Sequence, residues 1–269
     1  MTYNIKTGGQ DRGDRRRLDQ VLAVIDEQRP DVLALQELRG FGGFPGFRRD
    51  RLVDRCAMAL GMTAFLAGSL IGQPVAVLIR RPGRRVSAAP IRRPFHHAAA
   101  RVVVDTDRGP LAVVGTHLDP FSGRRRLREA RWLAARLRHD PMALLMGDLN
   151  SLDPWSEHDE RIERLAARHR SRHLMAGSSA TVDTRAVATL EAAGLVDLFR
   201  QAPSGSKDYT APTEQGGGRE FSGMRLDYIM ATARVAALAR GCRVVDGGAA
   251  EWASDHHPVV ADLDLSLAT

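Results

Sequence analysis

The chain has 269 residues, of which 43% are hydrophobic and 26% are charged, so it holds enough apolar side chains for a packed core. No stretch approaches the roughly 18 uninterrupted apolar residues of a membrane span. The first residues, MTYNIKTGG, lack the basic head and apolar run of a signal peptide. Cys56 and Cys242 are isolated, without metal-type spacing. We therefore expect no membrane span, two reduced thiols and a cytoplasmic location.

Arginine supplies almost all of the net charge of +7, because Lys6 and Lys207 are the only lysines. The arginines gather in four stretches of sequence, which are Arg15–Arg17, Arg48–Arg51, Arg80–Arg85 and Arg124–Arg128. A basic surface favours phosphate-bearing partners through counterion release and electrostatic steering. Each single cluster is more typical of a solvated helix face or loop. The charge therefore supports a phosphate-bearing partner without identifying it.

The first part of the chain combines short apolar runs with one clear amphipathic pattern. Thr2–Ile5 has the composition of a strand. Leu18, Val21 and Ile25 then fall on one face of a helix that ends before Pro30. The next predicted elements are a buried strand at Val32–Leu35, a loop over residues 39–51 and a helix over residues 51–60.

Strand patterns dominate the rest of the chain. In order, we predict strands at Val75–Ile79, Arg101–Asp105 and Leu111–Thr116, a helix over Arg124–Arg138, a strand at Met142–Met146, helices over residues 157–174 and Thr184–Ala193, a loop over residues 203–223, and strands at Leu226–Ala231, Arg243–Val245 and Val259–Leu263. A loop as long as residues 203–223 is often part of a functional rim. Because no repeat, linker or boundary interrupts the pattern, we expect a single domain over residues 1–269. We also expect a monomer.

Polar residues accompany these apolar runs, mostly where a strand ends. They are Asn4, Gln36–Glu37, Thr116–His117, Asp148–Asn150 and Asp255–His256, with Asp227 inside a further strand. One such acid usually marks only the point where a strand meets solvent. A sheet aligns its strand ends, however, so acids, amides and two histidines can meet there in one cleft.

These residue types suit phosphoryl chemistry. A hard ion such as Mg²⁺ needs one or two carboxylates and a phosphate oxygen, and no Cys or His cluster has the spacing of a zinc site. A histidine steadied by an aspartate is an ordinary means of activating water near neutral pH. Amides such as Asn4 and Asn150 can orient ligands without repelling phosphate. The pattern predicts a divalent-metal-dependent phosphoesterase.

Six short motifs, taken together and in this order, resemble those of the endonuclease/exonuclease/phosphatase superfamily, which includes DNase I, exonuclease III, deadenylases, inositol-polyphosphate 5-phosphatases and bacterial sphingomyelinases. The motifs are Thr2-Tyr3-Asn4-Ile5, Leu35-Gln36-Glu37, Gly115-Thr116-His117-Leu118, Gly147-Asp148-Leu149-Asn150, Arg225-Leu226-Asp227-Tyr228-Ile229 and Ser254-Asp255-His256-His257-Pro258. The resemblance runs from residue 2 to about residue 263. It implies an α+β fold, a four-layer α/β/β/α sandwich of two mixed β-sheets flanked by helices, with the site at one end of the sheets.

The resemblance also implies a metal site. Glu37 is similar to the principal metal ligand of the superfamily, and Asn4 to a residue that helps to hold that site. Asp255 is similar to a residue placed near a metal. The expected ion is Mg²⁺, with Mn²⁺ able to substitute.

The catalytic roles follow from the same resemblance. His256 looks like the general base or a phosphate-stabilising imidazole, and Asp227 looks like the carboxylate that orients it. Asp148 would position or deprotonate the attacking water, and Asn150 would bind the scissile phosphate. His117 matches a histidine that contacts phosphate or assists the leaving group in the DNase I, deadenylase and sphingomyelinase branches. Which imidazole is base and which is acid stays open.

The substrate is less well defined than the reaction. The leading hypothesis is a phosphodiesterase for DNA, RNA or a nucleotide-like diester, with Arg124 close enough to His117 in sequence to contact phosphate beside the cleft. The alternative is a phosphatase or phosphodiesterase for a small phosphorylated metabolite. A remote alternative is an inactive binding module. One departure disfavours a dedicated abasic-site endonuclease, because Thr116–Pro120 replaces the Tyr-x-Pro-Asn type segment of the exonuclease III branch.

Four more residues near these motifs receive plainer interpretations. His96 and His97 precede a strand and are near enough to reach the mouth of the cleft, but we expect them to be surface residues. We expect His257 to be structural, and Trp155 to pack against the fold rather than to stack on a base or sugar.

Overall fold

The computed structural model describes residues 1–41, 52–80, 86–88, 91, 93–178 and 180–266. The arginine cluster at Arg48–Arg51, residues 81–85 of the next cluster and most of the loop predicted over residues 39–51 lie outside these ranges.

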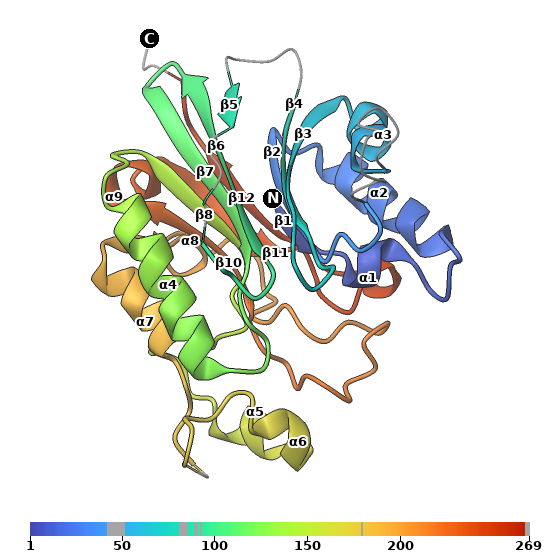
Figure 1. Ribbon diagram of the computed structural model, residues 1–269, viewed down its shortest axis with the longest axis vertical. Helices are drawn as coiled ribbons and strands as arrows, with labels where there is room; N and C mark the ends of the chain where they lie inside the picture. The colour runs from blue at the N-terminus through green and yellow to red at the C-terminus, as the bar shows by residue number, and fades with distance from the viewer. Residues whose placement is uncertain (42–51, 81–85, 89–90, 92, 179, 267–269) are drawn as a thin grey trace.

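Within the described ranges, two six-stranded β-sheets lie face to face, with helices on their outer faces (Figure 1). In spatial order, the first sheet contains β11 (Ala239–Val244), β12 (Val259–Leu263), β1 (Thr2–Asn4), β2 (Val32–Gln36), β4 (Val75–Arg80) and β3 (Met62–Ala67). The second contains β5 (Val86–Ala88), β6 (Ala98–Thr106), β7 (Gly109–His117), β8 (Ala143–Asp148), β10 (Asp227–Thr232) and β9 (Leu195–Asp197). Both sheets are mixed, since β1 runs parallel to β2 and β7 runs parallel to β8, whereas the other pairs are antiparallel.

Helices cover both outer faces. In Figure 1, α2 (Arg16–Gln28) and α3 (Leu52–Ala59) lie on the first sheet, and α4 (Gly123–Leu137) and α7 (Arg185–Ala192) lie on the second. Among the described residues, the remaining helices are short: α1 (Lys6–Gly9), α5 (Asp159–Glu163), α6 (Ala167–Arg170), α8 (Leu198–Gln201), α9 (Ala233–Ala236) and α10 (Ala250–Ala253). The structure confirms the predicted four-layer α+β sandwich.

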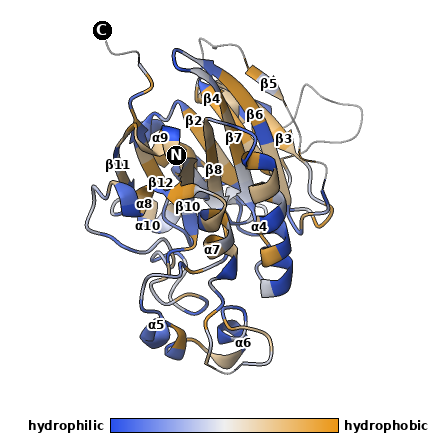
Figure 2. Ribbon diagram, turned by 90° about the vertical axis from the view of Figure 1, so that its left-hand side faces the viewer, coloured by the Kyte–Doolittle hydropathy of each residue, from blue (hydrophilic) through white to orange (hydrophobic). Residues whose placement is uncertain are grey.

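The core follows from the two-residue alternation of the strands. On β7, Val113 packs between the sheets, whereas its neighbour Val114 packs under α4 against Leu133. Figure 2 shows this division, with hydrophobic strands inside and a hydrophilic outer side on α4. Near the end of β7 the sheets approach closely, because a Cβ added at Gly115 would lie 2.9 Å from a methyl group of Val77.

Most predicted elements are confirmed, with shifts of a few residues at their ends, but one prediction is wrong and the strands β3, β5 and β9 were not predicted. The single helix predicted over residues 157–174 is split into α5 and α6, because Ala166 has extended backbone (φ −59°, ψ 146°) between them. The residues of β3 are mostly half-buried, so Met62–Ala67 lacks a clear alternation of apolar and polar residues.

Within the part of the chain that the structure describes, none of the helices has the length and apolar character needed to cross a bilayer.

Candidate active site

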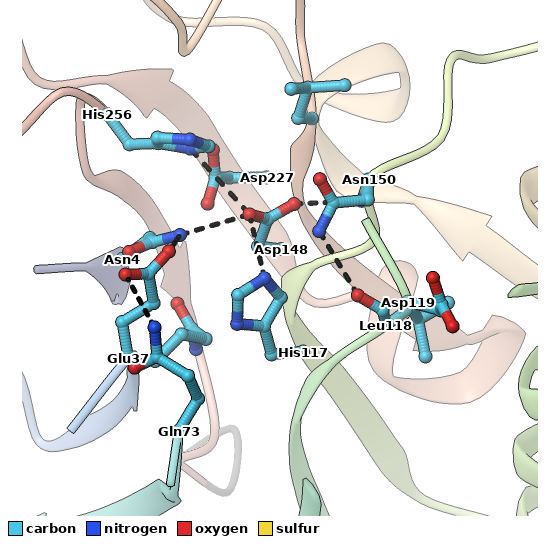
Figure 3. A network of polar contacts seen from close by, with 12 residues as sticks. Asn4, Glu37, Gln73, His117, Leu118, Asp119, Asp148, Asn150, Asp227 and His256 are labelled. Carbon is cyan, nitrogen blue, oxygen red and sulfur yellow. Dashed lines mark hydrogen bonds and ion pairs between the residues drawn. The ribbon is translucent and has the colours of Figure 1, made fainter. Parts of the chain in front are cut away.

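The predicted polar residues meet at one end of the two sheets. His117 is the last residue of β7, Asp148 is the last of β8, and Asp227 is the first of β10. The register pairs His117 with Asp148 across the parallel strands, and Asp148 with Asp227 across the antiparallel ones. The loop before β12 brings His256 to the same place (Figure 3). Strand pairing therefore assembles residues that are far apart in sequence.

Asp148 lies at the centre of this group. Its Oδ2 accepts a hydrogen bond from Asn4 Nδ2 at 3.0 Å and lies 3.3 Å from His117 Nε2 and 4.0 Å from His256 Nδ1. Gly147 makes this placement possible, because a Cβ there would lie 1.9 Å from the carbonyl oxygen of Thr116. Burial alone would raise the pKa of Asp148, but the two imidazoles outweigh it and lower the pKa below the usual range.

Asp227 and His256 form a buried pair. His256 Nδ1 lies 2.7 Å from Asp227 Oδ2, and both side chains are almost fully buried. Burial raises the pKa of Asp227. Burial alone would lower the pKa of His256, but the carboxylates of Asp227 and then Asp148 raise it well above its ordinary value. His256 Nδ1 is therefore engaged by Asp227, while the ring itself lines the cavity.

Glu37 stands on the opposite side of Asn4 from Asp148. The Asn4 amide nitrogen donates to Glu37 Oε1 at 3.2 Å as well as to Asp148. Glu37 Oε2 accepts from the backbone nitrogen of Thr7 at 2.9 Å and from Gln73 Nε2 at 3.3 Å (Figure 3). Three donors thus fix a half-buried carboxylate that faces the cavity.

Asn150 occupies a left-handed turn (φ 48°) directly after β8. Its backbone nitrogen donates to Asp148 Oδ1 at 2.8 Å, and its side-chain nitrogen donates to the carbonyl oxygen of Leu118 at 3.1 Å. These two bonds orient the amide against the cavity wall. The left-handed backbone is costly for a residue other than glycine, and asparagine tolerates it better than most.

A cavity of about 310 Å³ opens over these residues. We call its charged and amide wall the floor, which consists of Glu37, His117, Asp148, Asn150, Asp255 and His256. We call its more exposed wall the rim, which consists of Ile71, Phe121, Arg172, Glu220 and Phe221. Asp255 forms an ion pair with Lys6 at 3.3 Å on the floor. Arg124 is exposed and is not among the described residues that line the cavity, where Arg172 stands instead.

The prediction that His97 is a surface residue is wrong. Its ring is 6% exposed and stacks on His117, with ring centroids 4.0 Å apart and planes 18° apart. Burial, followed by repulsion from His117, lowers the pKa of His97 to about 2, so the ring is neutral. His96 is half-buried rather than free on the surface, and its Nδ1 lies 3.3 Å from Asp119. His97 therefore packs directly on the floor residue His117, and both His96 and His97 line the cavity.

The family model described as Endonuclease/Exonuclease/phosphatase family matches residues 1–256. The chain belongs to this family. No curated protein matches the chain.

Solved structures of this family superpose on almost the whole chain. An AP endonuclease from Archaeoglobus fulgidus is 21% identical, with a TM-score of 0.69 and coverage of 98% of both chains. A 3'-5' exonuclease from Neisseria meningitidis is 19% identical, with a TM-score of 0.63 and the same coverage. A 3' phosphatase from Neisseria bound to a product DNA hairpin gives the same identity, TM-score and coverage. At these identities the likeness establishes the fold.

Two places at this end of the sheets offer ligand atoms to a divalent cation, one at Asp148, Asp227 and His256 and the other at Glu37. Asp148, Asp227 and His256 place three ligand atoms within 4.8 Å of one another. We favour Glu37 instead, because His256 Nδ1 is already bonded to Asp227 and the raised pKa of His256 keeps a proton on the ring. Glu37 offers a fixed oxygen donor toward the cavity, and oxygen donors are what Mg²⁺ and Mn²⁺ prefer.

The sequence interpretation missed several residues that shape the site. Gln73 and Thr7 donate hydrogen bonds to Glu37, while Arg172 and His173 line the cavity. Gln73 lies just before β4, so a search for polar residues at both ends of strands would have found it. The Thr7 contact comes from a backbone nitrogen, which leaves no trace in the residue type. His257 and Trp155 are as expected: His257 is buried beside Lys207, and Trp155 donates to Glu191.

Proposed function

We propose that this protein is a Mg²⁺-dependent phosphoesterase that hydrolyses a phosphodiester in a nucleic acid or nucleotide-like substrate. One observation carries the proposal. Asp148 and His256, which is bonded to Asp227, share the floor with Glu37, and Asn4 bridges Asp148 to Glu37. Carboxylates for a hard cation and imidazoles for phosphate oxygens thus face one cavity. Family membership supports the phosphoester class of reaction.

The roles follow from position and charge. Glu37 and Asn4 would hold the cation with Asp255 nearby, and the cation would neutralise charge on the phosphate oxygens. Asp148 keeps its carboxylate ionised and would orient the attacking water. His256, held by Asp227 through Nδ1, would donate from Nε2 to a phosphate oxygen. Asn150 would bind the scissile phosphate, and His117 would contact the phosphate or the leaving oxygen.

The basic chain and its structural relatives support a nucleic-acid or nucleotide substrate. The net charge is +7, and the similar proteins include an exonuclease, an AP endonuclease and a phosphatase bound to DNA. The small size of the cavity keeps a small phosphorylated metabolite as the second candidate, since about 310 Å³ is near the lower limit of pockets that bury small ligands. A cytoplasmic location, a single domain over residues 1–269 and a monomeric state remain predictions.

A substrate panel tests the proposal. Single- and double-stranded DNA, RNA, bis(p-nitrophenyl) phosphate and a sugar phosphate are incubated with Mg²⁺, with Mn²⁺ and with EDTA. We expect degradation of nucleic acid that needs either metal, is abolished by EDTA and weakens as salt rises. Turnover of the small esters alone would favour the metabolite substrate. Absence of turnover with every ester would contradict the proposed function.

A further inference from the structure

The cavity changes character between its floor and its rim. The floor consists of acids, amides and imidazoles, whereas the rim carries three apolar side chains, Ile71, Phe121 and Phe221. Ile71 is 50% exposed and Phe121 is 60% exposed. Scattered apolar residues are normal on a protein surface, but these three line one charged cavity. This wall suits a ligand with a phosphate at one end and a flat apolar body at the other.

Phe121 is held firmly although it is exposed. The buried carboxylate of Asp119 accepts hydrogen bonds from the backbone nitrogens of Phe121 and Ser122, both at 2.8 Å. The backbone nitrogen of Asp119 in turn donates to Glu129 at 2.9 Å. The guanidinium of Arg172 lies 5.1 Å from the centroid of the Phe121 ring. A ring fixed in this way loses little entropy when a ligand stacks on it.

A second ring connects the rim to the floor. Phe221 lies edge-on to His256, with ring centroids 5.1 Å apart and planes at 81°. A group that contacts Phe221 is therefore close to the imidazole that we place on the phosphate.

An ion pair closes the rim on one side. Arg172, which follows α6, pairs with Glu220 from the long loop over residues 203–223, and both line the cavity. Together with the cavity volume of about 310 Å³, this closure suits one nucleotide rather than a length of duplex.

We propose that the rim binds the nucleobase of a single nucleotide, either free or at the end of a strand, with Phe121 as the stacking surface. This inference rests on the proposed function, because the floor is taken to hold the phosphate of the same nucleotide. Stacking of a base on an aromatic side chain strengthens binding by about tenfold or more.

The test compares two ligands that differ in the base. Binding of adenosine 5'-monophosphate and of ribose 5-phosphate is measured by calorimetry, with Ca²⁺ in place of Mg²⁺. For the wild type we expect about tenfold tighter binding of the mononucleotide. Phe121→Ala should abolish this ratio, and Phe121→Trp should keep it. Trp155→Ala, which removes an aromatic residue that does not line the cavity, should also keep it.

The outcomes separate the inference from the proposed function. Equal affinity for the two ligands, no binding of either, or a ratio that survives in Phe121→Ala would overturn the inference, whether or not the enzyme hydrolyses esters. A base preference lost in Phe121→Ala would support it even if the ester panel showed no turnover. Repeating the comparison with a trinucleotide that has or lacks its terminal base shows whether a strand end or a free nucleotide is preferred.

Discussion

The floor and the rim of the cavity are built in different ways. The floor stands on strand ends, and its central side chains, Asp148 and His256, are almost fully buried and held by Asn4 and Asp227, respectively. The rim comes from loops, and Phe121 and Ile71 stand exposed. Paired strands fix catalytic groups in place, whereas loops can change without disturbing them. The comparison suggests that the floor determines the reaction and the rim determines the substrate.

Among the predicted variants, replacement of the floor residue His256 should lower the rate of hydrolysis most. We expect His256→Ala to lower the rate of ester hydrolysis by roughly 10²- to 10⁴-fold, because a positioned proton donor or acceptor is lost. Steady-state assays with each ester that the wild type cleaves measure this effect. His139→Ala is the matched control, since His139 is exposed at the end of α4. Normal turnover by a folded His256→Ala protein would remove His256 from the mechanism.

The metal side of the floor should show graded effects. Glu37→Gln should lower the rate by about 10²-fold by weakening cation binding. Gln73→Ala should weaken cation binding by about tenfold, because it loosens Glu37 without removing it. Titration with Mn²⁺ measures both variants, with the exposed Glu27→Gln on α2 as control. Equal Mn²⁺ affinity in Glu37→Gln and the wild type would place the cation elsewhere.

The buried ring of His97, which stacks on His117, should appear as a pH effect on stability. His97 has a pKa of about 2 in the folded protein and about 6.5 when unfolded. Between these values the unfolded chain binds a proton that the folded chain does not, so stability falls as pH falls below about 6.5. Over this range His97 should lower the free energy of unfolding of the wild type by about 1.4 kcal/mol for each unit by which the pH falls.

His97→Phe keeps a ring against His117 and cannot be protonated. Urea unfolding at pH 7, 6 and 5 should therefore show a smaller loss of stability for the variant than for the wild type. Parallel losses would mean that His97 is protonated in the folded protein.

The sequence predicted the floor far better than the rim. Glu37 and Asp148 each lie two residues after the last side chain of an apolar run, and strand pairing carries such residues to one end of the sheets. Phe121 and Ile71 lie in loops, where the residue type does not reveal whether an apolar side chain is buried or exposed.

Arg124 and His97 show why other features of the site could not be predicted from the sequence. The sequence predicted a phosphate contact for Arg124, but the orientation of α4 leaves Arg124 exposed and buries Arg126 instead. The Arg126 guanidinium donates hydrogen bonds to the carbonyl oxygens of Asp119 and Arg172. The ring of His97 stacks on that of His117, a contact made only in the folded chain, so the sequence alone favours a surface position for His97.

The division between floor and rim is tested most directly by kcat/KM for two substrates that differ only in a terminal base, measured for the wild type, Asp148→Asn and Phe121→Ala. We predict that Asp148→Asn lowers both values by the same factor, on the order of 10²-fold or more, and leaves their ratio unchanged. Phe121→Ala should bring the ratio close to one. A change of ratio in Asp148→Asn, or an unchanged ratio in Phe121→Ala, would contradict the account.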